Sequence, residues 1–159
     1  SAITLEFATF RIVTGIFVRF ARPSPLMEIE LFMCRSDNYG VLIRDPATGA
    51  VFWTEPFKTK MAHAIGTPRQ HGYHLFISSF FDGSLLLRLD AAAPRVTEAW
   101  RIKGVSEVRP EGLHSLMSTP FIDDGTIYGV CAYGQLRGLK LETGELVKAL
   151  AVNAGIMIG

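Results

Sequence analysis

The chain has 159 residues, with 16 lysines and arginines against 15 aspartates and glutamates, and a formal net charge of +1. This balance gives no general electrostatic attraction for nucleic acid or for an acidic membrane surface, so we expect neither as a partner. The hydrophobic fraction of 48% and the 15 glycines are typical of a protein of strands and turns, and they exclude extensive disorder. No apolar run reaches the roughly 18 residues that a membrane span requires.

Residues 1–26 differ in character from the rest of the chain. Their longest apolar run, residues 12–18, is short and is followed by Pro23 and Pro25. Proline disfavours both a helix and a central strand. We therefore predict a leader of uncertain structure, without a clear signal peptide.

Strand-like sequence begins at residue 27. Residues 27–53 predict the strands and closing hairpin of a first partial blade, turned by Asp45-Pro46-Ala47-Thr48-Gly49. Pro46 presets φ for that turn, and Gly49 allows a positive φ.

Two longer units follow. Residues 54–102 predict one blade, and residues 103–148 predict another with a long entry loop. The pair Thr67-Pro68 returns as Thr119-Pro120 near the start of the second unit. Residues 149–159 depart from the pattern and predict an irregular tail.

Tryptophans mark the period of these units. Trp53 and Trp100 are 47 residues apart, and a further step of 48 reaches Lys148. A period in the forties with several short strands per unit is typical of a β-propeller. The sequence therefore predicts an all-β fold, a partial β-propeller of about two to three four-stranded antiparallel blades. Such a chain is either part of a larger propeller or a unit that must oligomerise.

Residues 43–53 resemble the tryptophan-docking motif of PQQ-like, quinoprotein-type β-propellers, and the resemblance extends to about residue 148. In that family, the threonine and glycine of the turn meet the indole of a neighbouring blade. The resemblance implies that these residues fasten blade to blade: Asp45, Thr48, Gly49, Trp53, Trp100, Thr143 and Gly144. The last copy departs from the motif, because Lys140 replaces its aspartate and Lys148 its tryptophan.

Residues 27–51 also resemble the N-terminus of glyoxalase II, the hydroxyacylglutathione hydrolase of the metallo-β-lactamase fold. That family binds its metals through a T-H-x-H-x-D-H cluster, which this sequence lacks. The resemblance therefore implies an N-terminal segment similar to that of glyoxalase II but without hydrolase activity.

Two histidines are candidates for a ligand site. His63 and His114 precede the two Thr-Pro pairs and are 51 residues apart, so both are expected at the same end of adjacent blades. A ligand at the mouth of the propeller would use such equivalent positions. The alternative is that each histidine hydrogen-bonds the loop between blades. No other pattern indicates a metal site or a catalytic nucleophile.

These observations favour a binding or scaffold module without catalysis of its own. The expected partner is a protein or peptide, or further blades of the same propeller. The alternatives are a fragment of a PQQ-dependent dehydrogenase, or an inactive glyoxalase-II-like start fused to blades. We expect no cofactor, since PQQ with calcium requires a complete ring in the family. The resemblance further implies a bacterial periplasmic or extracytoplasmic location.

Overall fold

The computed structural model of the chain describes residues 15–24, 27–34, 38–45, 47–58, 67–103, 111–115, 117–131 and 134–151. These residues form three four-stranded antiparallel sheets, and within each sheet the strands follow one another in chain order. The all-β fold of four-stranded blades predicted from the repeat is confirmed. None of the described residues forms a helix that could cross a membrane.

Each sheet is a meander of consecutive hairpins. The first sheet contains β1 (Gly15–Ser24), β2 (Met27–Cys34), β3 (Asn38–Arg44) and β4 (Val51–Lys58). The second contains β5 (Arg69–His71), β6 (His74–Ser79), β7 (Gly83–Leu89) and β8 (Val96–Ile102). The third contains β9 (Phe121–Asp123), β10 (Thr126–Cys131), β11 (Gln135–Lys140) and β12 (Leu146–Ala151).

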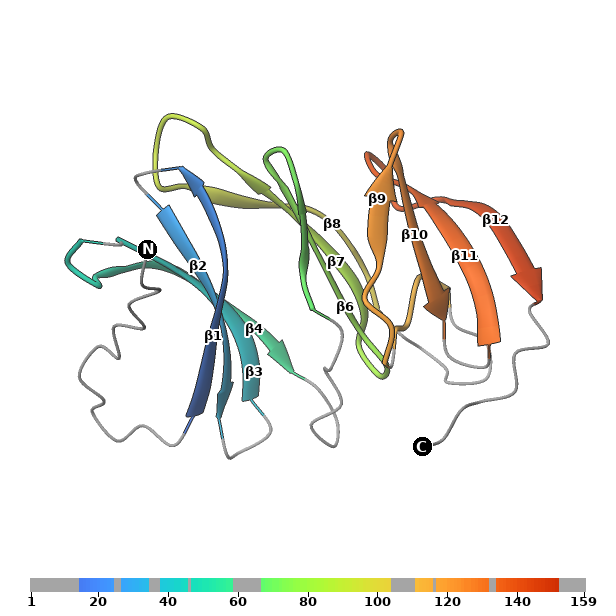
Figure 1. The fold of residues 1–159 in the computed structure, drawn as a ribbon, viewed down its shortest axis with the longest axis horizontal. Coiled ribbons are helices and arrows are strands. Elements are labelled where there is room, and N and C mark those ends of the chain that lie inside the picture. The colour runs from blue at the N-terminus through green and yellow to red at the C-terminus, as the bar shows by residue number, and fades with distance from the viewer. Residues whose placement is uncertain are drawn as a thin grey trace, which may run out of the picture.

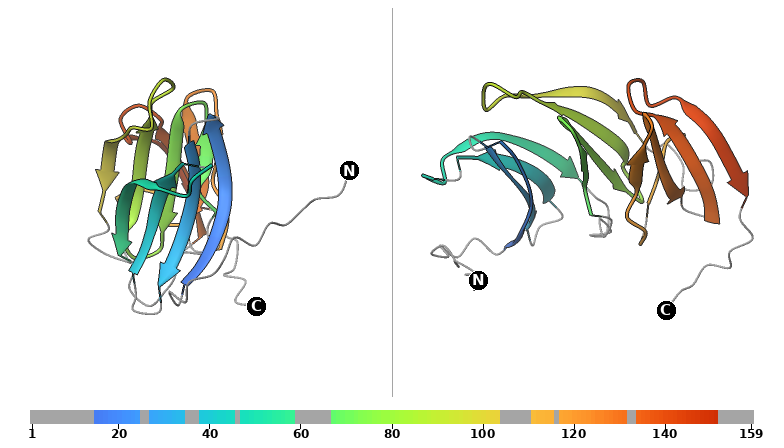
Figure 2. Two further views of the ribbon diagram at one scale, coloured as in Figure 1. Left: turned by 90° about the vertical axis from the view of Figure 1, so that its left-hand side faces the viewer. Right: turned by 45° about the horizontal axis from the view of Figure 1, so that its top comes forward.

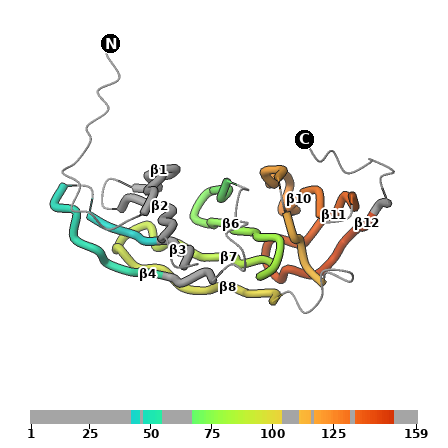
Figure 3. Tube along the Cα trace, turned by 90° about the horizontal axis from the view of Figure 1, so that it is seen from below, coloured from blue at the N-terminus to red at the C-terminus, as the bar shows by residue number. Residues whose placement is uncertain are grey.

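The three sheets follow one another in space as they do in the sequence (Figure 1). Turned forward, they lie side by side along an arc, as successive blades of a propeller do (Figure 2). Seen from below, β4 and β8 lie on the same side of the row (Figure 3). The second sheet therefore has a neighbouring sheet on each of its faces.

The apolar run in β7 explains why the second sheet is buried on both faces. Side chains of a strand alternate between its two faces. Leu85 and Leu87 accordingly belong to one buried cluster, while Leu86 belongs to another. A strand with one solvent-facing side would show polar residues at every second position.

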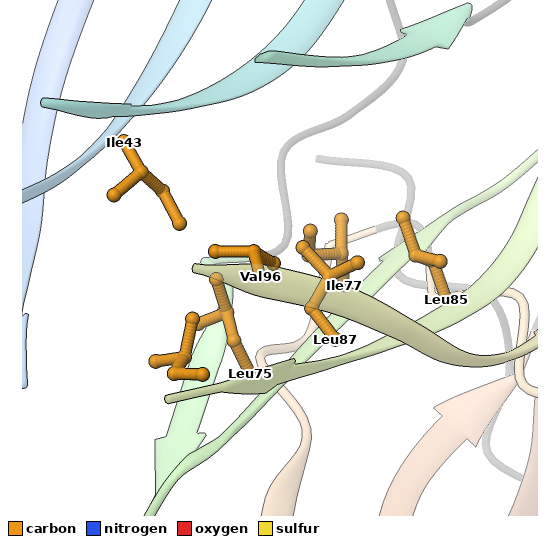
Figure 4. Packing of buried hydrophobic residues seen from close by; sticks show 7 residues of the cluster. Ile43, Leu75, Ile77, Leu85, Leu87 and Val96 are labelled. Carbon is orange, nitrogen blue, oxygen red and sulfur yellow. The ribbon is translucent and has the colours of Figure 1, made fainter. Parts of the chain in front are cut away.

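The first cluster joins the first and second sheets. Ile43 of β3 approaches Val96 and Leu75 of the second sheet (Figure 4). Its buried members are Ile43, Leu75, Ile77, Leu85, Leu87, Leu89 and Val96. The second cluster joins the second and third sheets, and its members are Phe76, Leu86, Leu113, Ile127, Cys131, Leu139 and Leu141. Cys131 is buried within this second cluster.

The structure differs from the sequence prediction at both ends of the repeat. Strand β1 lies inside residues 1–26, to which the sequence assigned no structure, and it runs through Pro23. Proline is tolerated because β1 is an edge strand of its sheet, and its register with β2 shifts between Ala21 and Ser24. The first blade thus has four strands, over Gly15–Ser24 to Val51–Lys58, rather than the closing part predicted over residues 27–53.

The third blade is also longer than predicted. Strand β12 continues through Ala151, within the predicted tail 149–159, because Gln135 of β11 still pairs with Ala151. Backbone pairing of this kind does not require the blade-like side-chain pattern on which the prediction rested.

Candidate functional site

Two hairpin turns, one in the first sheet and one in the third, have the same backbone geometry. In the first, Asp45 N donates to Ala50 O at 2.9 Å and Gly49 N donates to Asp45 O at 2.8 Å. In the third, Lys140 N donates to Glu145 O and Gly144 N donates to Lys140 O, both at 2.8 Å. Gly49 and Gly144 both have φ of 74°, in the left-handed region that favours glycine.

The two turns are held by different side-chain chemistry. The Asp45 carboxylate accepts hydrogen bonds from Ala47 N and Thr48 Oγ1, each at 2.8 Å, and these bonds lower the pKa of Asp45. At the equivalent place in the third sheet, Lys140 Nζ lies 2.7 Å from Glu145 Oε2, and this contact lowers the pKa of Glu145. The lysine in the last copy of the motif therefore has a partner of opposite charge within the turn.

A third turn of this type lies between β7 and β8, and sequence inspection missed it. Asp90 N donates to Arg95 O at 2.9 Å, and Asp90 Oδ1 accepts from Ala92 N at 2.8 Å. These bonds match those of the turn at Asp45. The only signal was an aspartate directly after an apolar strand, because Ala93 and Pro94 stand where the other copies have threonine and glycine.

Trp100 contacts the turn of the next sheet. Its indole Nε1 donates to Leu141 O at 2.8 Å, and a Cβ on Gly144 would lie 2.9 Å from Trp100 Cδ2. The ring also packs against Phe76, with centroids 6.0 Å apart. A buried indole needs an acceptor for its N–H, and a turn carbonyl supplies one here. The structure thus brings Trp100 and Gly144 together; Thr143 braces the same turn by accepting from Glu145 N.

We expect Gly144→Ala to destabilise the protein more than Gly49→Ala. Both changes place alanine at a φ of 74°, which costs about 1–2 kcal/mol. Only at Gly144 would the new methyl group meet the indole of Trp100; the nearest atom at Gly49 is Arg44 Nη1, 4.0 Å away. Overpacking adds roughly 1–3 kcal/mol at Gly144.

Denaturant unfolding of the two glycine variants measures this difference. Gly49→Ala is the matched control, since it carries the same backbone strain without the contact. Equal losses of unfolding free energy in the two variants would contradict the close approach of Trp100 to the turn.

Trp53 occupies the corresponding place in β4. It is half-buried and packs against the first cluster, opposite Ile43. In β4, β8 and β12, a register shift precedes Trp53, Trp100 and Lys148 respectively on the side of the turn. The same bulge therefore presents all three side chains at equivalent positions of the three sheets.

A segment at residues 111–115 passes between the second and third sheets and is hydrogen-bonded to the second sheet by serine hydroxyls. Ser84 Oγ donates to Leu113 O at 2.7 Å and accepts from Leu113 N at 3.0 Å. Ser78 Oγ also donates to Leu113 O, at 2.5 Å, and accepts from Ser115 N at 2.9 Å. We call residues 111–115 the strap. Its buried backbone groups are paired by side chains because it belongs to neither sheet.

Side chains of the third sheet hold the other side of the strap. Arg137 Nη1 donates to Gly112 O at 2.6 Å, and His114 N donates to Cys131 Sγ at 3.3 Å. Gln135 Oε1 accepts from Arg137 Nε and Nη2 and so orients the guanidinium. A buried cation is costly unless its donors are used, and here they are.

His114 lies inside this junction, with 1% of its surface exposed. Its Nδ1 is 2.8 Å from Phe80 O, and its buried Nε2 has no hydrogen-bond partner among the described residues. Burial, with a contribution from Arg137, lowers the pKa of His114 below the ordinary 6.5. The other histidine of the predicted pair, His63, falls outside the described residues.

We expect the unfolding free energy to decrease as the pH falls below 6.5, because of His114. The unfolded chain then binds a proton that the folded state resists, since the folded pKa is the lower one. The contribution of neutral His114 to the unfolding free energy is complete above pH 6.5. It decreases progressively as the pH falls toward the lower pKa of His114 in the folded protein.

Unfolding by denaturant at several pH values tests this expectation. His114→Asn keeps a polar group near Phe80 O but does not titrate, so it should flatten the pH dependence. His71→Asn, at an exposed histidine that ends β5, is the control and should leave it unchanged. An unaltered profile in His114→Asn would contradict the assignment.

Several polar side chains of the junction are engaged in structural bonds, while His114 Nε2 and Ser115 Oγ have no hydrogen-bond partner among the described residues. Ser78 and Ser84 donate to a backbone carbonyl rather than to a base, and His114 Nδ1 faces a carbonyl. No group of three or more His, Cys, Asp or Glu that could hold a metal occurs among the described residues.

Comparison with solved structures places this arrangement among known folds. BamB from Moraxella catarrhalis superposes with a TM-score of 0.56 over 83% of this chain and 35% of its own, at 17% identity. The fold is a β-propeller. A europium-containing methanol dehydrogenase is also similar, with a TM-score of 0.46, 15% identity, and coverage of 86% of this chain and 23% of its own.

Sequence comparison gives only short matches. Hydroxyacylglutathione hydrolases of Methylobacterium sp. (strain 4-46) and Brucella anthropi are 83% and 74% identical over 23 residues. Each match covers 14% of this chain and 9% of the relative. No family model matches the chain. In the structure, the described residues of the range 27–51 belong to β2, to β3 and to the connection that leads into β4, all within the first blade.

Proposed function

We propose that this chain is a PQQ-like β-propeller module that acts as a binding or scaffold unit. Its binding surface is the side of the third sheet that faces away from the second, which we call the open face. Its members are Phe121, Tyr128, Val130, Leu136, Gly138 and Lys148. The proposal rests on the apolar side chains that this face leaves uncovered.

Alternation along β10 defines the two faces of the third sheet. Ile127 and Cys131 are buried in the cluster shared with the second sheet. Tyr128 and Val130 lie between them in sequence and therefore point the other way. Val130 is 41% exposed, and Phe121, which stacks on Tyr128 with ring centroids 5.1 Å apart, is 49% exposed.

In the second sheet, the row of side chains equivalent to the one on the open face is covered by a neighbouring sheet. Phe76, Leu86 and Trp100 are paired across β6, β7 and β8, and all three pack against the third sheet. The corresponding row of the third sheet is Tyr128, Gly138 and Lys148. Contiguous exposed apolar surface marks an interaction site in a folded protein. We infer that a protein surface or a further blade covers the open face.

We expect no catalysis from this chain, because no serine–histidine pair is formed at the junction. Ser78 and Ser84 donate to a backbone carbonyl, and Ser115 Oγ and His114 Nε2 are not hydrogen-bonded to each other. Fold likeness does not transfer an activity. The extracytoplasmic location implied by the resemblance belongs to the same proposal. Incubation with PQQ and Ca²⁺ is expected to give no dye reduction, and measurable reduction would contradict the scaffold function.

Site-specific photo-crosslinking tests the binding surface. A photoreactive phenylalanine analogue at Val130 is expected to give a discrete adduct with one protein species in extract of the source organism. The same analogue at Tyr73, a 49% exposed aromatic in the β5–β6 turn, is the control and is expected to give none. Identical adduct patterns at both sites would contradict a role for the open face.

A further inference from the structure

The junction between the second and third sheets shows what a neighbour of the open face requires. Trp100 projects from the bulge of β8 onto a glycine turn of the next sheet. Lys148 stands at the equivalent bulge of β12, on the open face. A matching occupant would therefore present a turn of the same geometry, with a group that suits a cation instead of an indole.

The first sheet of this same chain presents such a turn. Its Gly49 has the φ of Gly144, and no heavy atom lies nearer than 4.0 Å to a Cβ placed there, the nearest being Arg44 Nη1. Thr48 and Gly49 are exposed. The turn used in the third sheet is thus repeated in the first, with its contact surface uncovered.

The two turns begin with side chains of opposite charge, and only the turn in the first sheet begins with a carboxylate that could pair with Lys148. The first turn begins with Asp45, whose carboxylate is kept ionised by its hydrogen bonds with Ala47 and Thr48. The third turn begins with Lys140, whose ion pair with Glu145 already uses the carboxylate of that turn. Lys148 of one molecule therefore suits the Asp45 turn of another and not the turn of its own sheet.

We propose that two copies of this chain associate head to tail, with the open face of each copy against the outer side of the first sheet of the other and Lys148 paired with Asp45. This inference rests on the proposed function and names the occupant of its binding surface. The two interfaces are identical and heterologous, and a closed ring of two copies leaves neither an open face nor an outer side of a first sheet uncovered. Two sets of three sheets give six blades, within the roughly 4 to 8 of closed propellers.

The mass of the purified chain in solution tests this inference. Sedimentation and light scattering are expected to show a concentration-dependent dimer of the 17.5 kDa chain. Phe121→Lys, which places a charge on the open face, is expected to give a monomer with unchanged circular dichroism. Tyr73→Lys, at an equally exposed aromatic outside that face, is expected to remain a dimer.

A charge exchange tests the pairing itself. Asp45→Lys and Lys148→Glu are each expected to weaken the dimer about tenfold or more, because each places like charges together. The double variant Asp45→Lys, Lys148→Glu is expected to recover most of the affinity. The backbone of this turn is compatible with lysine, since Lys140 occupies the equivalent position in the third sheet. Asp45→Lys also removes the hydrogen bonds from Ala47 N and Thr48 Oγ1, so circular dichroism of the variant must match that of the parent chain.

A monomer at all concentrations would overturn the inference, as would a dimer that persists in Phe121→Lys or a double variant weaker than both single ones. The proposed function and the association of two copies can be distinguished by the crosslinking experiment. A monomer whose Val130 analogue still crosslinks to a different protein retains the binding surface and excludes the second copy as its occupant.

Discussion

Replacing Trp100 by alanine is expected to lower the unfolding free energy by about 3–5 kcal/mol, a large part of the stability of a domain this size. The indole packs on Phe76 and on Gly144 of the next sheet, and its N–H is bonded to Leu141 O. Alanine removes all of these contacts and leaves a cavity between two blades. Urea unfolding followed by circular dichroism gives both the midpoint and its slope.

Trp100→Phe separates the hydrogen bond from the packing. It keeps an aromatic ring against Phe76 and leaves Leu141 O without its indole donor, so we expect a smaller loss than in Trp100→Ala, of which about 1 kcal/mol is the hydrogen bond. A loss below about 1 kcal/mol in Trp100→Ala would show that the contact does not hold the two blades together.

Leu113→Ala is expected to cost about 2–5 kcal/mol, since Leu113 is fully buried between the second and third sheets. Its side chain fills the space above Gly129 of β10. A Cβ on Gly129 would lie 2.7 Å from Leu113 Cδ2, nearer than packed atoms approach. Gly129→Ala alone is therefore also destabilising, by about 1–3 kcal/mol.

The double variant Leu113→Ala, Gly129→Ala tests whether the two residues occupy one shared space. With the leucine shortened, the methyl group at residue 129 has room and fills part of the cavity. The combined loss is expected to be smaller than the sum of the single losses, because residues in contact are not additive. Additive losses would show that Leu113 and Gly129 do not share one space. Gly49→Ala, a glycine far from the strap, provides an additive control with Leu113→Ala.

The blade repeat was predictable because its signals are local. Turn chemistry at Asp45 and Gly49, and the run Leu85-Leu86-Leu87 in β7, each reflect the φ preference or the burial of a single strand or turn. Strand β1 was missed because the sequence shows Pro23 but does not show that its strand lies at an edge. The turn at Asp90 was missed because it has neither threonine nor glycine.

The candidate site was harder to predict, since it depends on long-range pairing. Nothing local distinguishes Ser78 and Ser84 from serines that face solvent, and their partners in the strap are 29 to 37 residues away. His114 was identified only as a repeat of the position of His63. Its burial and its contact with Phe80 O follow from the strap crossing between two sheets.

The sequence by itself determined the unit of this protein: a four-stranded meander with a period in the forties, because strand alternation and turn geometry are encoded residue by residue. It also marked Trp53, Trp100 and Lys148 as equivalent positions. Only the tertiary structure decided what each position meets. Trp100 reaches a turn some 40 residues further along the chain, and the apolar row around Lys148 remains uncovered, because contact depends on which sheets become neighbours in space.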